Sequence, residues 1–504
     1  MPQQKRIPYL GTIALIVWLM QVTSSACASP QQTGAGTSQA IAKKPEKHVP
    51  FEEKLLGTMP PEYEEPPDIT GGTMFLDNPA QWAFVARQNG KLFVAINNKK
   101  GTEFDEIRTI FQSPDRSTMG YVAEESHAAD RKTFLVLGNK TIPLQQGESI
   151  DLGETNHLLG PGLSLLSPPV FSPDSKKVAY ISFHEDKKKE AAAILEGDWG
   201  DPAPVTVKYG LEFDWVWEPV FSPDGTTVAY AAGEAKKRSR LCTACPVQGM
   251  FIVIGDKKGP EFERVRFPVF NAAGTVVAYQ ASLLGHGDPN TREIVVVGDK
   301  KRGAQNVLGQ IVGFAWVGIP VFSPDGTAVS YPVLQSADFL PDKRPKHGFV
   351  VVGNKKGPKF DFVGEPVFSL NGTSIAHLAK VGEKEFIVLG DKTGPEFDEV
   401  QSPVFSPDGH TIAYQAKQNQ RQFIVAGDKR GTEFDEVGEP VFSPDGATVA
   451  YRARRDKKWL IVAGEKLGQE FDVVGNPVFS PDCTKVAYGA KQGREFWWKV
   501  MDVR

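Results

Sequence analysis

The sequence predicts an all-β fold, a β-propeller built from about ten four-stranded blades. The first observation is a repeat, in which a phenylalanine recurs every 36 to 60 residues: Phe75, Phe111, Phe171, Phe221, Phe270, Phe322, Phe368, Phe405, Phe442 and Phe479. The second is a Ser-Pro-Asp turn that follows seven of these phenylalanines. The third is that no stretch shows the 3.6-residue hydrophobic period of an amphipathic helix.

Each unit divides into four short strand-like pieces, which are clearest in residues 438–475. The first piece is Pro-Val-Phe, and the turn after it uses Pro to preset φ, Asp to bond the backbone and Gly to accept a positive φ. The second and third pieces, Thr-Val-Ala-Tyr and a run such as Phe-Ile-Val-Val-Gly, are rich in β-branched and aromatic residues. Glu-Phe-Asp-Glu-Val, after a second Gly-rich turn, is predicted as the fourth strand.

The two ends of the repeat array predict how the ring closes. The last unit stops after residues 496–500 without a Glu-Phe-Asp-Glu strand, whereas residues 61–65, Pro-Glu-Tyr-Glu-Glu, precede the first anchor. We expect this spare N-terminal strand to complete the C-terminal blade, because an open sheet edge is prone to aggregation. The propeller is therefore predicted to span residues 61–504.

The first 60 residues are predicted to precede the propeller. Residues 1–28 have the features of a signal peptide: Lys5 and Arg6, an apolar stretch at 7–22, and Ala26-Cys27-Ala28 as a cleavage site. The protein is thus expected to be exported to the periplasm or the extracellular space. Acylation of Cys27, which would attach it to the envelope, is the alternative. Residues 29–60, rich in Pro, Gln, Lys and Gly, are predicted to form a disordered linker.

The recurring Ser-Pro-Asp-Gly and Val-Ala-Tyr segments resemble the WD-like propeller repeats of the Tol-type, TolB-like translocation protein family. The resemblance covers residues 61–504 and implies an exported β-propeller repeat protein. A Tol-type protein carries a separate α/β domain ahead of its propeller, and here only the predicted linker stands in that place. The partner and role of that family are therefore not transferred to this chain.

The composition and the motifs of the sequence argue against several classes of function. The 57 Lys and Arg residues against 61 Asp and Glu residues give a net charge of -4, which argues against a nucleic-acid-binding protein. We find no Gly-x-Ser-x-Gly elbow, no His-Glu-x-x-His and no phosphate-binding loop. These observations predict a non-enzymatic binding scaffold without a cofactor.

The loops between the second and third strands supply the candidate binding surface. They are long in units three to six, the short loops of units eight and nine are basic too, and all are expected to emerge on one face. The candidate partner-binding residues are Lys236, Lys237, Arg238, Arg240, Lys343, Arg344, Arg454 and Arg455. Because Arg and Lys pair with anionic groups, we expect the partner to be a protein or an anionic envelope component.

A second interpretation is a propeller enzyme, either a lyase or a lactonase-like hydrolase with a metal in the central channel. Glu218, Glu365 and Glu439 each precede Pro-Val-Phe, on the strand expected to line the channel, and carboxylates there could hold a cation or act as general acid and base. Ile319, Ser402 and Asn476 occupy the same position in other units, which favours a solvated rim instead.

Overall fold

The computed structural model contains strands, turns and irregular segments in the part of the chain that it describes. That part comprises residues 51–65, 73–78, 81–115, 117–127, 130–143, 148–150, 169–184, 187–199, 205–235, 248–282, 293–298, 314–336, 347–401 and 403–503. No helix within these ranges is long and apolar enough to cross a membrane.

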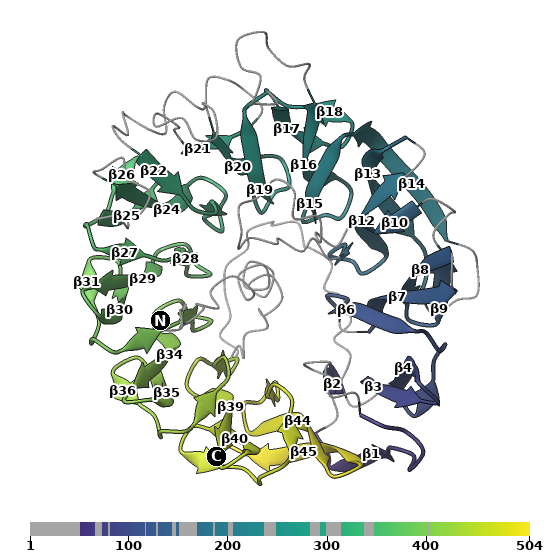
Figure 1. Ribbon diagram of the computed structural model, residues 1–504. Coiled ribbons are helices and arrows are strands. Elements are labelled where there is room, and N and C mark those ends of the chain that lie inside the picture. Colours follow the sequence, from purple (N-terminus) through teal and green to yellow (C-terminus); the bar gives the residue numbers. More distant parts are fainter. Residues whose placement is uncertain are drawn as a thin grey trace, which may run out of the picture.

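The strands form ten antiparallel sheets arranged in a ring, which confirms the predicted β-propeller (Figure 1). The sheets are numbered here as blades 1 to 10 in chain order. The inner strands are β2 (Thr73–Asn78), β6 (Glu106–Gln112), β10 (Glu148–Ile150), β11 (Val170–Phe171), β15 (Trp215–Phe221), β19 (Arg264–Phe270), β22 (Phe314–Val317), β23 (Val321–Phe322), β27 (Phe362–Val363), β28 (Val367–Phe368), β32 (Glu399–Val400), β33 (Val404–Phe405), β37 (Glu436–Val437), β38 (Val441–Phe442), β42 (Val473–Val474) and β43 (Val478–Phe479).

The second and third strands are the longest in most blades and form antiparallel hairpins. The second strands are β3 (Gln81–Gln88), β7 (Met119–His127), β12 (Lys177–His184), β16 (Val228–Ala235), β20 (Val277–Ser282), β24 (Val329–Ser336), β29 (Ile375–Val381), β34 (Ile412–Gln418), β39 (Val449–Arg455) and β44 (Lys485–Gln492). The third strands are β4 (Lys91–Ile96), β8 (Asp130–Leu137), β13 (Lys189–Glu196), β17 (Gln248–Ile254), β21 (Glu293–Val297), β25 (His347–Val352), β30 (Lys384–Leu389), β35 (Arg421–Ala426), β40 (Lys458–Ala463) and β45 (Glu495–Asp502).

The outer strands differ from the prediction. They are β5 (Lys99–Lys100), β9 (Lys140–Pro143), β14 (Thr206–Phe213), β18 (Lys257–Lys258), β26 (Lys355–Lys356), β31 (Lys392–Thr393), β36 (Lys429–Arg430), β41 (Lys466–Leu467) and β1 (Lys54–Thr58). Six of them, β5, β18, β26, β31, β36 and β41, are two-residue strands that begin with a lysine in the second turn of the unit. The Glu-Phe-Asp-Glu-Val segment is a crossover instead, because it must travel from the outer edge of one blade to the inner edge of the next. Phe397 makes one bridge to β30, and Glu399 then pairs with Lys417 of the following blade.

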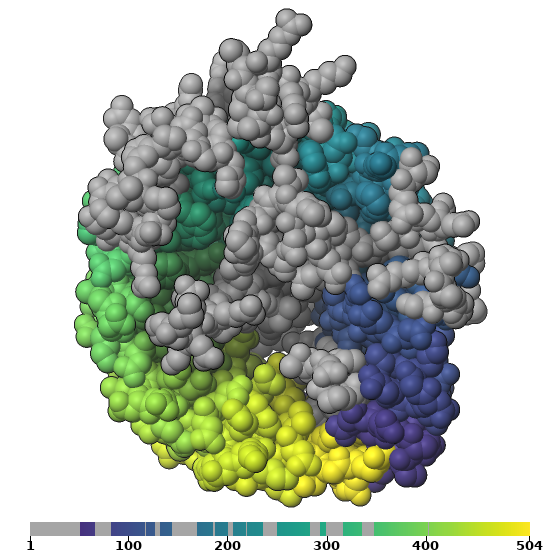
Figure 2. Space-filling view, in the orientation of Figure 1, coloured from purple at the N-terminus to yellow at the C-terminus, as the bar shows by residue number. Residues whose placement is uncertain are grey.

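The ring closes through an N-terminal strand, as predicted, but through other residues. β1 pairs with β45, with Lys54 opposite Trp498 and Thr58 opposite Glu495. Figure 2 shows the purple N-terminal segment against the yellow C-terminal blade. The predicted closing residues 61–65 belong mainly to the crossover that leads from blade 10 to blade 1, since Glu64 bridges to Arg87 in blade 1. The propeller therefore begins before residue 61, within the segment predicted as linker.

The Ser-Pro-Asp turn is held by its own side chains. In the last unit, the Ser480 hydroxyl donates to Asp482 at 2.6 Å and accepts the Lys485 N–H at 2.9 Å. Asp482 also accepts the Thr484 N–H at 3.1 Å. The hydrogen bonds from Ser480 and Thr484 lower the pKa of Asp482 to about 2. Cys483 has a φ of 59° at the position where most units place glycine.

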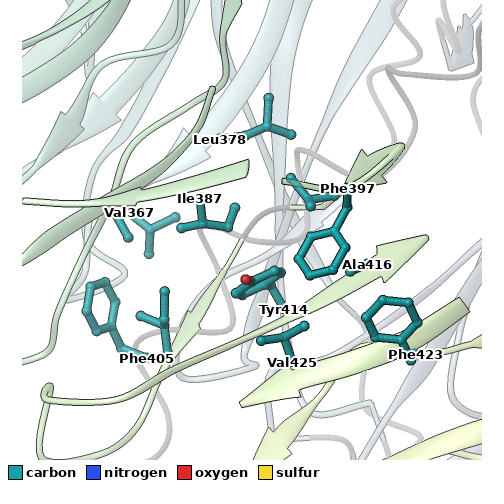
Figure 3. Close-up of a cluster of buried hydrophobic side chains, with 12 residues drawn as sticks. Val367, Leu378, Ile387, Phe397, Phe405, Tyr414, Ala416, Phe423 and Val425 are labelled. Carbon is teal, nitrogen blue, oxygen red and sulfur yellow. The ribbon is translucent and has the colours of Figure 1, made fainter. Parts of the chain in front are cut away.

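The hydrophobic core lies between blades, and the crossover phenylalanine fills it. Figure 3 shows the cluster between blades 7 and 8, to which blade 7 contributes Leu378 and Ile387. Phe397 packs edge-on against Tyr414 and Phe423 of blade 8, with ring centroids 6.4 and 5.4 Å apart. The Phe of the predicted fourth strand thus joins one blade to the next.

Candidate binding surface

One face of the ring carries both the crossovers and the tips of the hairpins between second and third strands. Asp398 shows that these features meet. This crossover residue pairs with Lys384 of blade 7 at 2.7 Å and accepts the N–H of Asn419, in the hairpin turn of blade 8, at 2.8 Å. The Lys384 hydrogen bond lowers the pKa of Asp398. We call this side of the ring the crossover face.

The same cation–aspartate pair recurs around the crossover face. Besides Lys384–Asp398, it joins Lys91 to Asp105, Lys189 to Asp214, Arg421 to Asp435 and Lys458 to Asp472. These basic residues stand at the beginning of third strands, and each pairs with the crossover that leaves its blade. Many cations of this face are therefore already neutralised by contacts that join neighbouring blades.

The predicted partner-binding residues divide into two groups. Lys236, Lys237, Arg238, Arg240, Lys343 and Arg344 lie outside the described residues. The other two make internal contacts. Arg454 pairs with Glu436 at 2.8 Å, and its guanidinium lies 5.8 Å from the Trp459 ring centroid. The guanidinium of Arg455 lies 5.3 Å from the Phe434 ring centroid. Both arginines thus contribute to the fold of blade 9.

The crossover face also carries a row of aromatic side chains that was not predicted from the sequence. Three of its four members occupy the inner-strand position that carries ion-paired glutamates in blades 8 and 9, Glu399 with Lys417 and Glu436 with Arg454, and the fourth stands two residues further along its strand. We define the aromatic row by four residues of blades 4, 6 and 7: Trp215, Trp217, Trp316 and Phe362.

The aromatic row is partly open to solvent. Trp316 is 46% exposed and Phe362 is 39% exposed. The Trp215 and Trp217 rings stack on each other, with centroids 6.4 Å apart and planes 8° from parallel. A Cβ atom at Gly233, opposite Trp215 in β16, would lie 3.3 Å from the Trp215 ring, so glycine makes room for it.

Buried carboxylates hold the backbone beneath this row. Glu293 of blade 5 accepts the Val317 N–H at 3.0 Å, and Gln280 donates to the Val317 carbonyl at 2.6 Å. Glu190 of blade 3 accepts the Val216 N–H at 2.6 Å. Each valine is fully buried next to a member of the row. The neighbouring blade therefore fixes the strands from which Trp215, Trp217 and Trp316 project, and we call these contacts the clamps.

The inner-edge glutamates have separate surroundings. Glu365 of blade 7 accepts the Ile319 N–H of blade 6, and burial raises the pKa of Glu365 to about 7. Glu439 of blade 9 interacts with the charge of Arg452 in its own blade. The structure does not describe the Glu218 side chain. Within the described residues, no three His, Cys, Asp or Glu side chains are grouped so that they could hold a metal ion.

Among known proteins, this chain resembles only solved structures that contain propellers. No known protein family matches the sequence, and no curated protein does. The Pyrococcus horikoshii acylaminoacyl peptidase is 13% identical with a TM-score of 0.32, over 76% of this chain and 57% of that one. The β-propeller domain of the Pyrococcus furiosus trilobed protease is 12% identical with a TM-score of 0.30, over 79% of this chain and 95% of that one.

A third similar structure is prolyl oligopeptidase B from Galerina marginata. It is 11% identical with a TM-score of 0.33, over 64% of this chain and 55% of that one. The chain thus spans a little over half the length of these peptidases. The resemblance to Tol-type repeats remains an interpretation of the sequence.

Proposed function

We propose that this chain is a non-enzymatic binding scaffold, which contacts a protein or an anionic envelope component through the crossover face of blades 4 to 7. The observation that carries the proposal is the aromatic row. Exposed aromatic rings are enriched where proteins bind partners, since each buries a large area at a low cost in side-chain entropy. At 46% exposure, Trp316 is the clearest such group.

The clamps support this proposal, because a binding surface gains affinity when its contact groups are already held in place. Val216 and Val317 are fixed by Glu190 and Glu293, so the adjacent tryptophans are carried by ordered backbone. Elsewhere on the ring, Glu399 and Glu436 are paired at the equivalent position and have partners within the chain. At this position of the inner strand, blades 4, 6 and 7 thus carry aromatic rings in place of ion-paired glutamates.

The strands that lead into two of the predicted basic loops reach the crossover face, and the loops themselves lie outside the described residues. Residues 236–247 follow β16 of blade 4, and residues 337–346 follow β24 of blade 6, where the second strands reach the crossover face. Lysines and arginines there would give an anionic partner charge contacts around an aromatic centre, an arrangement common at protein interfaces. Export, expected from residues 1–28, would place this surface in the envelope or outside the cell.

A photoreactive amino acid placed at Trp316 tests the proposal. The full-length protein would be irradiated in cells that produce it, and crosslinked species would be resolved by electrophoresis and mass spectrometry. The matched control is Val473, which has the same register in blade 10. We expect a discrete adduct from position 316 and none from position 473. Equal crosslinking from both positions, or none from 316, would contradict the proposal.

A further inference from the structure

The outer edge of β45 is occupied by a segment from the other end of the chain. Residues 51–65 contain five glutamates and one lysine. Within this segment, β1 adds a strand to blade 10, and Glu64 then bridges to blade 1. We call residues 51–65 the closing segment.

Basic residues of blade 10 receive the closing segment at three points. The Arg494 guanidinium donates to the backbone carbonyls of Met59 at 3.1 Å and Tyr63 at 2.9 Å, and also to that of Pro60. Lys499 pairs with Glu53 at 3.3 Å. Lys491, which is 6% exposed, pairs with Glu65 at 2.7 Å. The acceptor edge thus combines a strand ladder with cations that match an acidic segment.

Few apolar side chains of the closing segment are buried. Met59 is 1% exposed and packs with Trp82 and Phe496, and Tyr63 is 9% exposed with its ring centroid 4.8 Å from that of Phe93, whereas Leu55 is 43% exposed. Ion pairs with exposed partners add little stability, since Glu53 and Glu65 are 55% and 53% exposed. A segment held by only two fully or nearly buried side chains is expected to open locally before the rest of the ring.

We propose that the outer edge of β45, with Arg494, Lys491 and Lys499, is a strand-acceptor site that can take the closing segment of a second copy of this chain. Main-chain pairing supplies most of the affinity, and the cations select an acidic extended segment. A second copy offers the same residues and could therefore reproduce every contact described here. The segment in cis normally occupies the site, because its tether gives it a high effective concentration.

A labelled peptide with the sequence of residues 51–65 tests this proposal on the full-length protein. In Met59→Ala the cis segment loses the more deeply buried of its two anchors, so the peptide, which keeps its methionine, should bind at least tenfold more tightly than it binds the wild type. Leu55→Ala is the matched control and should bind like the wild type. Adding Arg494→Ala to Met59→Ala should weaken binding at least tenfold.

Two results would overturn the proposal. One is equal peptide affinity for the Met59→Ala and Leu55→Ala proteins, and the other is unchanged affinity after Arg494→Ala is added. Hydrogen exchange of the wild type gives an independent test that needs no variant. Amides of β1 should exchange at least tenfold faster than those of β44, and equal protection of both strands would exclude an accessible acceptor edge.

Discussion

Replacing Glu293 with alanine should loosen the strand that carries Trp316. Glu293 is 7% exposed and accepts hydrogen bonds from the Val317 N–H, the Gln280 amide and the Arg264 guanidinium. In Glu293→Ala, Gln280 keeps the Val317 carbonyl as an acceptor, and Arg264, whose side chain is 27% exposed, can turn to water. The Val317 N–H is left buried and unpaired.

The expected loss follows from these contacts. An unpaired buried N–H costs about 1–3 kcal/mol, and the small cavity left by the side chain adds about 1 kcal/mol. We therefore expect Glu293→Ala to lower the free energy of unfolding by about 2–4 kcal/mol. Guanidinium titration followed by far-UV circular dichroism measures this loss, and a shift in the summed emission of the nine tryptophans relative to the wild type would accompany a change around Trp316.

A second glutamate provides the control. Glu399 pairs with Lys417, and the two side chains are 37% and 39% exposed, so Glu399→Ala should cost about 0–1 kcal/mol. If Glu293→Ala destabilises the protein no more than Glu399→Ala, the reasoning about the clamps is wrong.

Three further predictions concern pH and packing. Hydrogen bonds lower the pKa of Asp482 to about 2, and a depressed pKa stabilises the fold above the unfolded value of about 4, so the melting temperature should fall between about pH 4 and pH 2. The Asp482→Asn variant should show a shallower fall. The aspartates of five other such turns have lowered pKa values too: Asp115, Asp174, Asp224, Asp325 and Asp408. Burial raises the pKa of Glu365 to about 7, so its contribution to stability is present below about pH 4 and is lost as the pH rises towards 7. Glu365→Gln should therefore melt higher than the wild type at pH 8 and equally at pH 4, and a lower melting temperature at pH 8 would contradict the assignment. A Cβ atom at Gly318 would lie 2.5 Å from the Pro332 ring and 3.2 Å from the Trp316 ring, so Gly318→Ala should cost about 1–3 kcal/mol and shift the tryptophan emission. Unchanged emission and stability would show that the site relaxes freely.

Local patterns in the sequence were sufficient for the blades but not for the connections between them. The Phe anchors and Ser-Pro-Asp turns predict hairpins correctly, since both depend on neighbouring residues. The Glu-Phe-Asp-Glu-Val segment has the composition of a strand, yet Phe397 and Glu399 pair with different blades. Where the segment leaves one blade and joins the next depends on the distance from the outer edge of the first blade to the inner edge of the second. The sequence of a single unit does not reveal that distance.

The aromatic row was missed for a related reason. Trp215 and Trp217 alternate with Val216 in a run that is typical of a buried strand. Val216 is fully buried in the core between blades 3 and 4, so the alternation turns the two tryptophans to the opposite side of the strand, where Trp217 packs against the core between blades 4 and 5. Comparison of the units offered a signal, because Trp215, Trp316 and Phe362 stand where blades 8 and 9 have glutamate. The closing segment was misplaced because residues 61–65 resemble the crossover motif, whereas β1 does not.

The crossovers make each boundary between blades a self-contained joint. Phe397 fills the space between blades 7 and 8, and Asp398 ties the strand it leaves to the hairpin it approaches. A duplicated unit inserted there would bring its own phenylalanine, aspartate and cation, and would leave the joints on either side intact. The circumference of such a ring can therefore change by whole units during evolution, while a change within one joint must be matched on both sides of it.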